Sequence, residues 1–218
     1  MSNLEFLKSL SNHKGISGFE YSLRDIIIPY FEKYADEISI DKLGNITALK
    51  KGKSAEGKIK ILLAAHMDEI GLMVKDIEEN GFIRFTNVGG IDPRTILGQE
   101  VIVHGKEDLF GVIGAKPPHL QDSKEEDKAI KIEDMTIDRT FQELKNNRVT
   151  GKALDNRAGL VALYECIKEL NDLNHEADVY FIATVQEEES MAGAITSSYR
   201  INPDIGIAVD VGFGTTPE

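Results

Sequence analysis

The sequence predicts an α/β protein in which a parallel-rich sheet is flanked by helices and interrupted by a small β-barrel-like insert. An apolar run over 59–65 ends abruptly at His66, which is typical of a buried parallel strand. Helical and strand patterns alternate on both sides of this run. Residues 71–146 change to short strands between Gly-, Asn- and Asp-containing turns, which predicts the insert. Residues 1–70 and 147–218 are therefore expected to form one domain that the insert divides.

The first part of the chain contains two predicted helices and a predicted hairpin. Residues 3–10 form an amphipathic pattern with three leucines on one face. Ser17-Gly18-Phe19-Glu20 matches a capping box, and apolar residues follow it at helical spacing. Pro29 is expected to kink or shorten this second helix. Alternation over 37–41 and the apolar stretch 46–49 then predict two strands joined by a turn.

After the insert, the alternation of helices and strands resumes. Asp155-Asn156 is expected to cap a helix whose apolar stripe extends over 160–170. A buried strand is predicted over 178–185, followed by a short helix over 192–199. The apolar stretch 205–211 predicts a third strand of the same kind.

Composition excludes several classes of partner. The net charge of −12, without any basic block, makes nucleic acid and anionic membranes poor partners. No apolar run approaches the roughly 18 residues that a membrane helix needs, and the first residues lack the pattern of a signal peptide. The single Cys166 excludes an intrachain disulfide, which favours the reducing cytoplasm. Since it lies within an apolar helical pattern, Cys166 is expected to be a buried small hydrophobe.

Acidic residues and a histidine stand at equivalent places in four segments: His66 with Asp68, Asp155, Glu187 with Glu188, and Asp210. Three of these segments follow predicted strands, whose carboxyl ends lie together at one edge of a parallel sheet. Carboxylates gathered there would repel one another, and a divalent cation relieves that cost. Each group alone has a simpler explanation, as a helix cap, an acidic loop or a turn residue. The combination predicts a metal site.

Three motifs carry a resemblance to a known family: Ala-His-Met-Asp-Glu-Ile-Gly at 65–71, Gly-Lys-Ala-Leu-Asp-Asn-Arg-Ala-Gly at 151–159, and Val-Gln-Glu-Glu at 185–188. Together they resemble the tetrahedral aminopeptidases, a family of di-metal peptidases. The family includes glutamyl and deblocking aminopeptidases and some members labelled cellulase M. The resemblance covers nearly all of the 218 residues.

The resemblance implies two divalent metal ions, either zinc or cobalt, with manganese as a further candidate. The implied ligands are His66, Asp155 as the bridging residue, Glu188 and Asp210. Glu187 would be the general base, and Asp68 would orient His66 from behind. Two metals roughly 3.5–4 Å apart would activate a shared water and polarise the scissile carbonyl.

The implied substrates are peptides with a free N-terminus, since the α-amine would dock near the metals. The insert resembles the dimerisation domain through which members of the family build a hollow tetrahedral homo-oligomer. The resemblance therefore implies a metal-dependent aminopeptidase that removes N-terminal residues.

Members of this family also supply a metal-binding histidine after the strand that carries Asp210. The five histidines of this chain are His13, His66, His104, His119 and His175. One metal position is therefore expected to be weakened or empty, in a chain that looks shortened at its C-terminus. Two alternatives stay open at this point: an inactive metal-binding or assembly relic of the family, and a glycosidase. The glycosidase is disfavoured because neighbouring Glu187 and Glu188 do not face each other across a bond.

Overall fold

The computed structural model describes residues 2–54, 59–77, 83–114, 142–144, 148–150 and 153–212. The chain divides into two compact units. The larger unit combines Met1–Glu69 with Thr140–Glu218, and the smaller unit is Ile70–Arg139. None of the helices in the described ranges is both long and apolar enough to cross a membrane.

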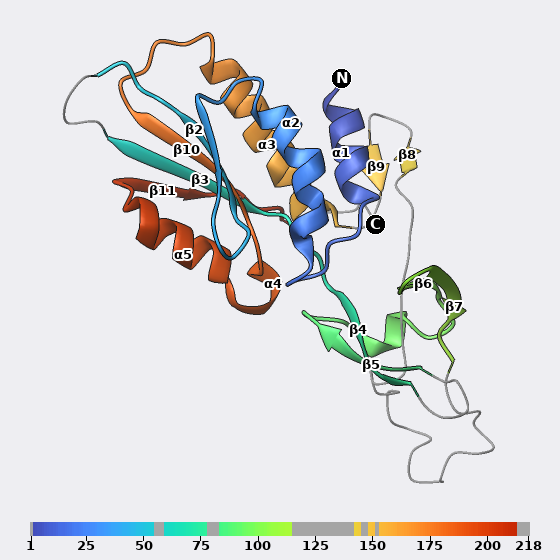
Figure 1. Ribbon diagram of the computed structural model, residues 1–218. Coiled ribbons are helices and arrows are strands. Elements are labelled where there is room, and N and C mark those ends of the chain that lie inside the picture. Colours follow the sequence, from blue (N-terminus) through green and yellow to red (C-terminus); the bar gives the residue numbers. More distant parts are fainter. Residues whose placement is uncertain are drawn as a thin grey trace. The chain divides into compact units, whose positions relative to one another are not determined.

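The larger unit is built on a five-stranded sheet with the order β1-β2-β10-β3-β11 (Figure 1). The strands are β1 (Glu37–Ile40), β2 (Ile46–Lys50), β10 (Asp178–Thr184), β3 (Lys60–His66) and β11 (Ile205–Ala208). β3 pairs in parallel with both β10 and β11, whereas β2 is antiparallel to β1 and β10. The α/β class is confirmed, and the sheet is mixed, with its parallel half at β10, β3 and β11.

Helices cover both faces of this sheet (Figure 1). On one face lie α1 (Asn3–Ser11), the 3-10 turn η1 (Glu20–Leu23) with α2 (Arg24–Phe31), and α3 (Leu154–Leu170). The opposite face carries α5 (Ala192–Ile201), which follows the single turn of α4 (Glu187–Ser190). A short hairpin of β8 (Gln142–Leu144) and β9 (Arg148–Thr150) belongs to the same unit.

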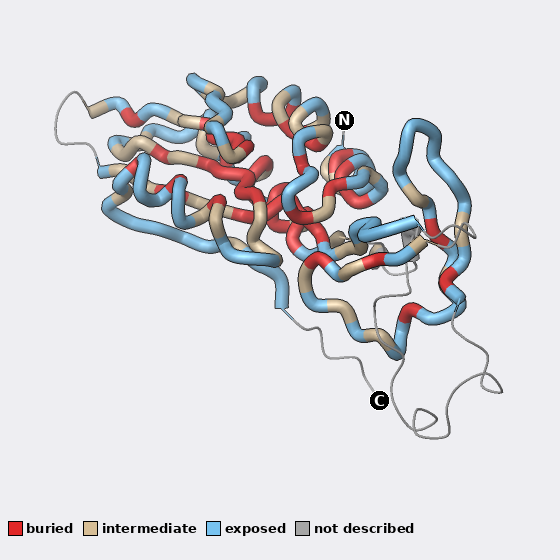
Figure 2. The backbone as a smooth tube through the Cα atoms, turned by 60° about the horizontal axis from the view of Figure 1, so that its bottom comes forward, coloured by how far each residue is buried: buried red, intermediate tan, exposed pale blue. Residues whose placement is uncertain are grey.

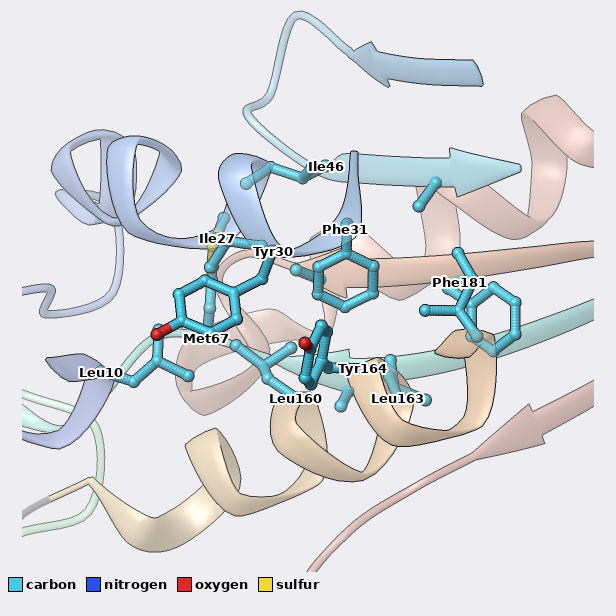
Figure 3. Packing of buried hydrophobic residues seen from close by; sticks show 14 of the residues in the cluster. Leu10, Ile27, Tyr30, Phe31, Ile46, Met67, Leu160, Leu163, Tyr164 and Phe181 are labelled. Carbon is cyan, nitrogen blue, oxygen red and sulfur yellow. The ribbon is translucent and has the colours of Figure 1, made fainter. Parts of the chain in front are cut away.

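The main core lies between the sheet and the three helices on its first face (Figure 3). The Phe6 ring stacks on the Tyr30 ring with centroids 3.8 Å apart, and Tyr164 meets both rings edge-on. These aromatic rings join α1, α2 and α3 into one layer. Burial of such large apolar groups is the dominant stabilising term of the unit.

The central strands are buried on both faces, which explains their continuous apolar sequence. Phe181 of β10 points into the main core, whereas its neighbour Ile182 packs with Leu62 and Ile201 beneath α5. Figure 2 shows the buried residues concentrated along these strands and along the helix faces that cover them. β11 is exposed along its whole length (Figure 2), because it is the last strand of the described sheet.

The smaller unit contains two separate antiparallel hairpins. β4 (Gly71–Ile77) pairs with β5 (Ile83–Val88), and β6 (Glu100–His104) pairs with β7 (Asp108–Val112). The 3-10 turn η2 (Pro93–Thr95) lies between them in sequence. The insert is therefore rich in β-strands, as predicted. Within the described residues its two hairpins form separate sheets and do not close into a barrel.

Two local predictions in the N-terminal part were wrong. The buried face of α1 is formed by Phe6 and Leu10, while Leu4 is exposed. The expected capping box at residues 17–20 is absent, because the Glu20 carboxylate accepts hydrogen bonds from Gly18 N–H and from a distant backbone group. The Glu20 carboxylate therefore binds the backbone N–H of Gln186, far along the chain, in place of the expected capping-box contact.

Cys166 is exposed on α3, contrary to the buried position expected for it. The apolar stripe of the helix lies one residue away, at Ile167. Partial burial raises the pKa of the Cys166 thiol and Glu169 adds to that effect, so the thiol is not activated as a nucleophile.

Candidate metal centre

The end of β3 supplies a buried histidine and a buried aspartate. His66, 3% exposed, is the last residue of the strand and lies opposite Thr184 of β10. Its Nδ1 is 3.3 Å from Oδ1 of Asp68, which is fully buried. The opposite ring nitrogen, Nε2, faces the carboxylates of neighbouring segments. Asp68 therefore lies behind the ring, and Nε2 is the ring nitrogen that faces the other carboxylates.

Asp155 enters the site from the start of α3. The backbone is irregular there: Ala153 has a left-handed conformation, and residues 155 and 156 depart from helical angles. Asn156 caps the regular helix, since its Oδ1 accepts a hydrogen bond from Gly159 N–H at 3.1 Å. The Asp155 carboxylate instead lies 3.1 Å from His66 Nε2, with its side chain 63% exposed. The prediction that both residues cap the helix therefore holds only for Asn156.

The turn after β10 carries the two glutamates. Gln186 adopts a left-handed conformation, with φ 55° and ψ 37°, and α4 begins at the next residue. The Asp68 carboxylate accepts Glu187 N–H at 3.1 Å and Glu188 N–H at 3.2 Å. Oε2 of Glu187 lies 3.6 Å from His66 Nε2. The same buried aspartate therefore lies behind the histidine and holds the backbone of both glutamates.

Asp210 follows β11, the strand on the other side of β3. Asn156 Nδ2 donates to the carbonyl of Val209 at 2.6 Å, and Val209 N–H donates to Ala64 O at 2.8 Å. These two bonds fix the residue before Asp210 to α3 and to β3. Sequence reasoning assigned Asn156 only to helix capping and did not identify this second contact.

The predicted ligands meet in two groups that share one histidine. His66 joins Asp155 and Asp210 in one group, and Glu187 and Glu188 in the other. Within each group the candidate ligand atoms lie within 4.8 Å of one another. Imidazole nitrogen and carboxylate oxygen are the donors that zinc and other divalent ions of this type accept, so the residues fit such ions.

The charges of the site favour a cation among the carboxylates. Burial lowers the pKa of His66, but Asp68, followed by Glu187 and Asp155, overcomes this and raises it to about 9. Burial raises the pKa of Asp68, yet its bond to His66 and the two backbone N–H groups bring it below the ordinary value. Burial also raises the pKa of Glu188, and the neighbouring carboxylates add to this. A proton on His66 and a metal ion would satisfy the same need for positive charge.

The fold and the site together define a class: α/β proteins with a histidine–carboxylate centre at the carboxyl ends of parallel strands. The family described as M42 glutamyl aminopeptidase matches residues 44–143 and 136–217. The chain belongs to this family, and the resemblance found in its motifs is thereby confirmed.

Similar proteins agree with this assignment. The lysyl aminopeptidase of Pyrococcus furiosus is 34% identical over 243 residues, covering 100% of this chain and 68% of the relative. A TET aminopeptidase from the marine sediment archaeon Thaumarchaeota archaeon SCGC AB-539-E09 has a TM-score of 0.89 and 34% identity, covering 99% of this chain and 67% of that chain. The Pyrococcus horikoshii TET1 peptidase, which can assemble into a tetrahedron or a large octahedral shell, has a TM-score of 0.78 and 37% identity. That match covers 96% of this chain and 68% of the TET1 chain, so the sequence spans about two thirds of these relatives.

Proposed function

We propose that this chain carries the metal centre of an aminopeptidase that removes N-terminal residues from peptides. The observation that carries the proposal is the position of His66 between two carboxylate groups. Membership of the M42 family and the names of the similar proteins supply the reaction class.

In this proposal His66, Asp155, Glu188 and Asp210 would hold two divalent ions, and His66 is the residue that belongs to both ligand groups. Zinc, cobalt and manganese all suit mixed histidine and carboxylate donors. Ions bound there supply Lewis acidity, which polarises a peptide carbonyl and makes water more acidic.

Glu187 is assigned the role of general base. Its backbone is held by Asp68, while its carboxylate reaches toward His66 Nε2 and remains partly open to solvent. A carboxylate so placed accepts a proton from the attacking water and delivers it to the leaving amine. Glu188 shares the same anchor, so one glutamate is assigned to metal binding and its neighbour to proton transfer.

Asp68 is assigned to orientation of His66. It is fully buried and lies on the Nδ1 side of the ring, away from the exposed Asp155. The arrangement of carboxylate, imidazole and metal is a common way to fix the ring and increase its basicity.

The substrate class follows from the chemistry of the peptide end. A protonated or neutral α-amine is suited to a site that is rich in carboxylates, whereas a blocked N-terminus offers no such group. The family description names glutamyl residues and the Pyrococcus furiosus relative is named for lysyl residues. The proposal therefore concerns the free N-terminus and not one particular side chain.

The smaller unit, Ile70–Arg139, which corresponds to most of the insert expected over residues 71–146, is proposed as a surface for homo-oligomer assembly. Assembly is described for the TET1 peptidase of Pyrococcus horikoshii. In the β6–β7 hairpin, Phe110 is 71% exposed and faces Ile102 across the strands, and Val112 is also exposed. Light scattering after size exclusion should show a homo-oligomer, and Phe110→Ser should reduce its mass. A monomeric wild-type protein would contradict this part of the proposal.

The test of the reaction is release of p-nitroaniline from aminoacyl anilides by protein treated with a chelator and then supplied with zinc, cobalt or manganese. Turnover should require the added metal and should fall at least about 100-fold in Glu187→Gln. The matched control is the same anilide with an acetylated α-amine, which should not be cleaved. Metal-independent cleavage, or equal cleavage of the acetylated anilide, would refute the proposal. Metal binding without turnover would favour the inactive metal-binding protein.

A further inference from the structure

Glu20 is a buried carboxylate that has no part in the reaction proposed above. It is 4% exposed and lies at the start of η1. Its Oε1 accepts two backbone hydrogen bonds, from Gly18 N–H at 2.8 Å and from Gln186 N–H at 3.1 Å. The second bond links the N-terminal region to the turn that carries Glu187. A carboxylate removed from water in this way is stable only because such bonds replace its hydration.

Glu20 belongs to a series of acceptors that engage four consecutive backbone N–H groups. Val185 N–H donates to Asn45 Oδ1 at 2.9 Å, and Gln186 N–H donates to Glu20. The next two N–H groups, of residues 187 and 188, donate to the two oxygens of Asp68. The first N–H groups of a helix have no acceptors within the helix. Here Asp68 binds the first two N–H groups of α4, Glu20 binds that of the cap residue Gln186, and Asn45 binds that of the residue before it.

The held backbone has a conformation that it would not adopt readily by itself. Gln186 is left-handed at φ 55°, which is unfavourable for a residue with a Cβ atom. Gly193 packs closely against the same turn, since a Cβ there would lie 2.4 Å from both Val185 O and Asn45 Oδ1. The turn is therefore fixed by specific partners and tight packing together, and Glu20 is the partner that binds Gln186 itself.

We propose that Glu20 is a positioning residue: by holding Gln186 N–H it fixes the turn after β10 and directs the Glu187 side chain toward His66. The consequence for catalysis rests on the proposed role of Glu187 as general base. The consequence for the backbone does not rest on that role, and it is measured separately.

The direct test is hydrogen exchange at the Gln186 amide in Glu20→Ala, Glu20→Gln and the control Glu32→Ala. Glu20→Ala removes the acceptor, so the exchange rate of this amide should rise about 10–100-fold. Glu20→Gln keeps a carbonyl oxygen in reach, so the rate should stay within about threefold of wild type. Glu32 is exposed at the end of α2, and its replacement should change nothing. Unchanged exchange of Gln186 in a folded Glu20→Ala protein would overturn the proposal.

The second test is the effect on turnover. Glu20→Ala should lower kcat about 10–100-fold with KM within about twofold, because misdirection of the base affects the reaction more than binding. The Glu20→Gln variant should have most of the wild-type kcat. If the role of Glu20 were purely electrostatic, kcat of Glu20→Gln would be as low as that of Glu20→Ala, and this result would count against positioning. If thermal melting shows that Glu20→Ala does not fold, Glu20→Asp, one methylene shorter, takes its place in both tests. A wild-type protein without turnover would refute the proposed function, while the exchange experiment still decides the role of Glu20.

Discussion

Replacement of Arg157 by methionine is expected to lower the free energy of unfolding by about 3–5 kcal/mol. Arg157 is fully buried on α3, although it carries a charge. Its Nη1 donates to the carbonyls of Leu10 at 2.7 Å and His13 at 2.6 Å, and its Nε donates to Met67 O at 3.1 Å. Its Nη2 lies 3.3 Å from Oε1 of Glu69. The guanidinium therefore joins the end of α1, the exit of β3 and the start of α3.

The magnitude follows from the groups that would lose a donor. Leu10 O keeps a hydrogen bond from His13 N–H, so it contributes little. The carbonyls of His13 and Met67 each lose a hydrogen bond from Arg157, at about 1–3 kcal/mol each when buried. The Glu69 carboxylate loses its cation but keeps Gly15 N–H at 3.0 Å. Methionine recovers part of the apolar packing, so the total stays near 3–5 kcal/mol.

Urea unfolding followed by circular dichroism at 222 nm measures this effect. The described α-helices all lie in the larger unit, so the signal reports that unit. With a slope of about 2–3 kcal/mol/M, the urea midpoint should fall by about 1–2.5 M. The control is Lys168→Ala on the same helix, whose ion pair with Glu165 lies at the surface, so this change should leave the urea midpoint nearly unaltered. A change below about 1 kcal/mol in Arg157→Met would show that the buried network does not stabilise the fold as argued.

Three further predictions concern the site, the turn before β2 and the core. His66→Ala should weaken binding of cobalt or zinc at least about 100-fold by calorimetry, because it removes the only imidazole nitrogen of either ligand group; wild-type affinity would contradict a site at His66. Burial raises the pKa of Asp41, but the Asn45 amide and the N–H groups of residues 44 and 45 bring it below the ordinary value. The carboxylate therefore stabilises the fold above about pH 4, and the difference in urea midpoint between wild type and Asp41→Ala should narrow as pH falls below that value; a constant difference would refute this. Phe6→Ala should lower the free energy of unfolding by about 3–5 kcal/mol in the same measurement, and the control Leu4→Ala, at an exposed position, by less than about 1 kcal/mol. Equal effects of the two substitutions would contradict the observed buried face of α1.

The strand ends could be predicted because the signal is local. An apolar run that stops at His66 indicates both a buried strand and the place where it delivers polar groups. The parallel pairing of β10, β3 and β11 then brings Glu187 and Asp210 to the same edge, as expected from the general rule for such sheets. Barrel closure of the insert could not be predicted with equal success, because hairpin patterns specify pairs of strands and not the contacts between pairs.

The supporting residues left no such local signal. Ser17-Gly18-Phe19-Glu20 has the spacing of a capping box, but Glu20 binds a residue 166 positions away. Arg157 follows Asp155-Asn156 in sequence and reads as an ordinary polar residue in the first turn of a helix. Only the folded chain shows that its donors meet carbonyls from residues 10–15. Long-range partners of buried polar groups depend on the tertiary structure, which single-sequence patterns do not contain.

The groups that hold the candidate metal centre come in part from a region without any predicted ligand. His13 O accepts from Arg157, Gly15 N–H donates to Glu69, and Glu20 holds the turn before the paired glutamates. The family match begins at residue 44, so the supporting contacts from residues 13–20 lie before the matched stretches that contain the ligand motifs. A ligand geometry is only as fixed as the backbone beneath it. A chain with intact ligand motifs but altered residues 10–20 should therefore keep every donor atom and lose part of the arrangement that brings the donors together around His66.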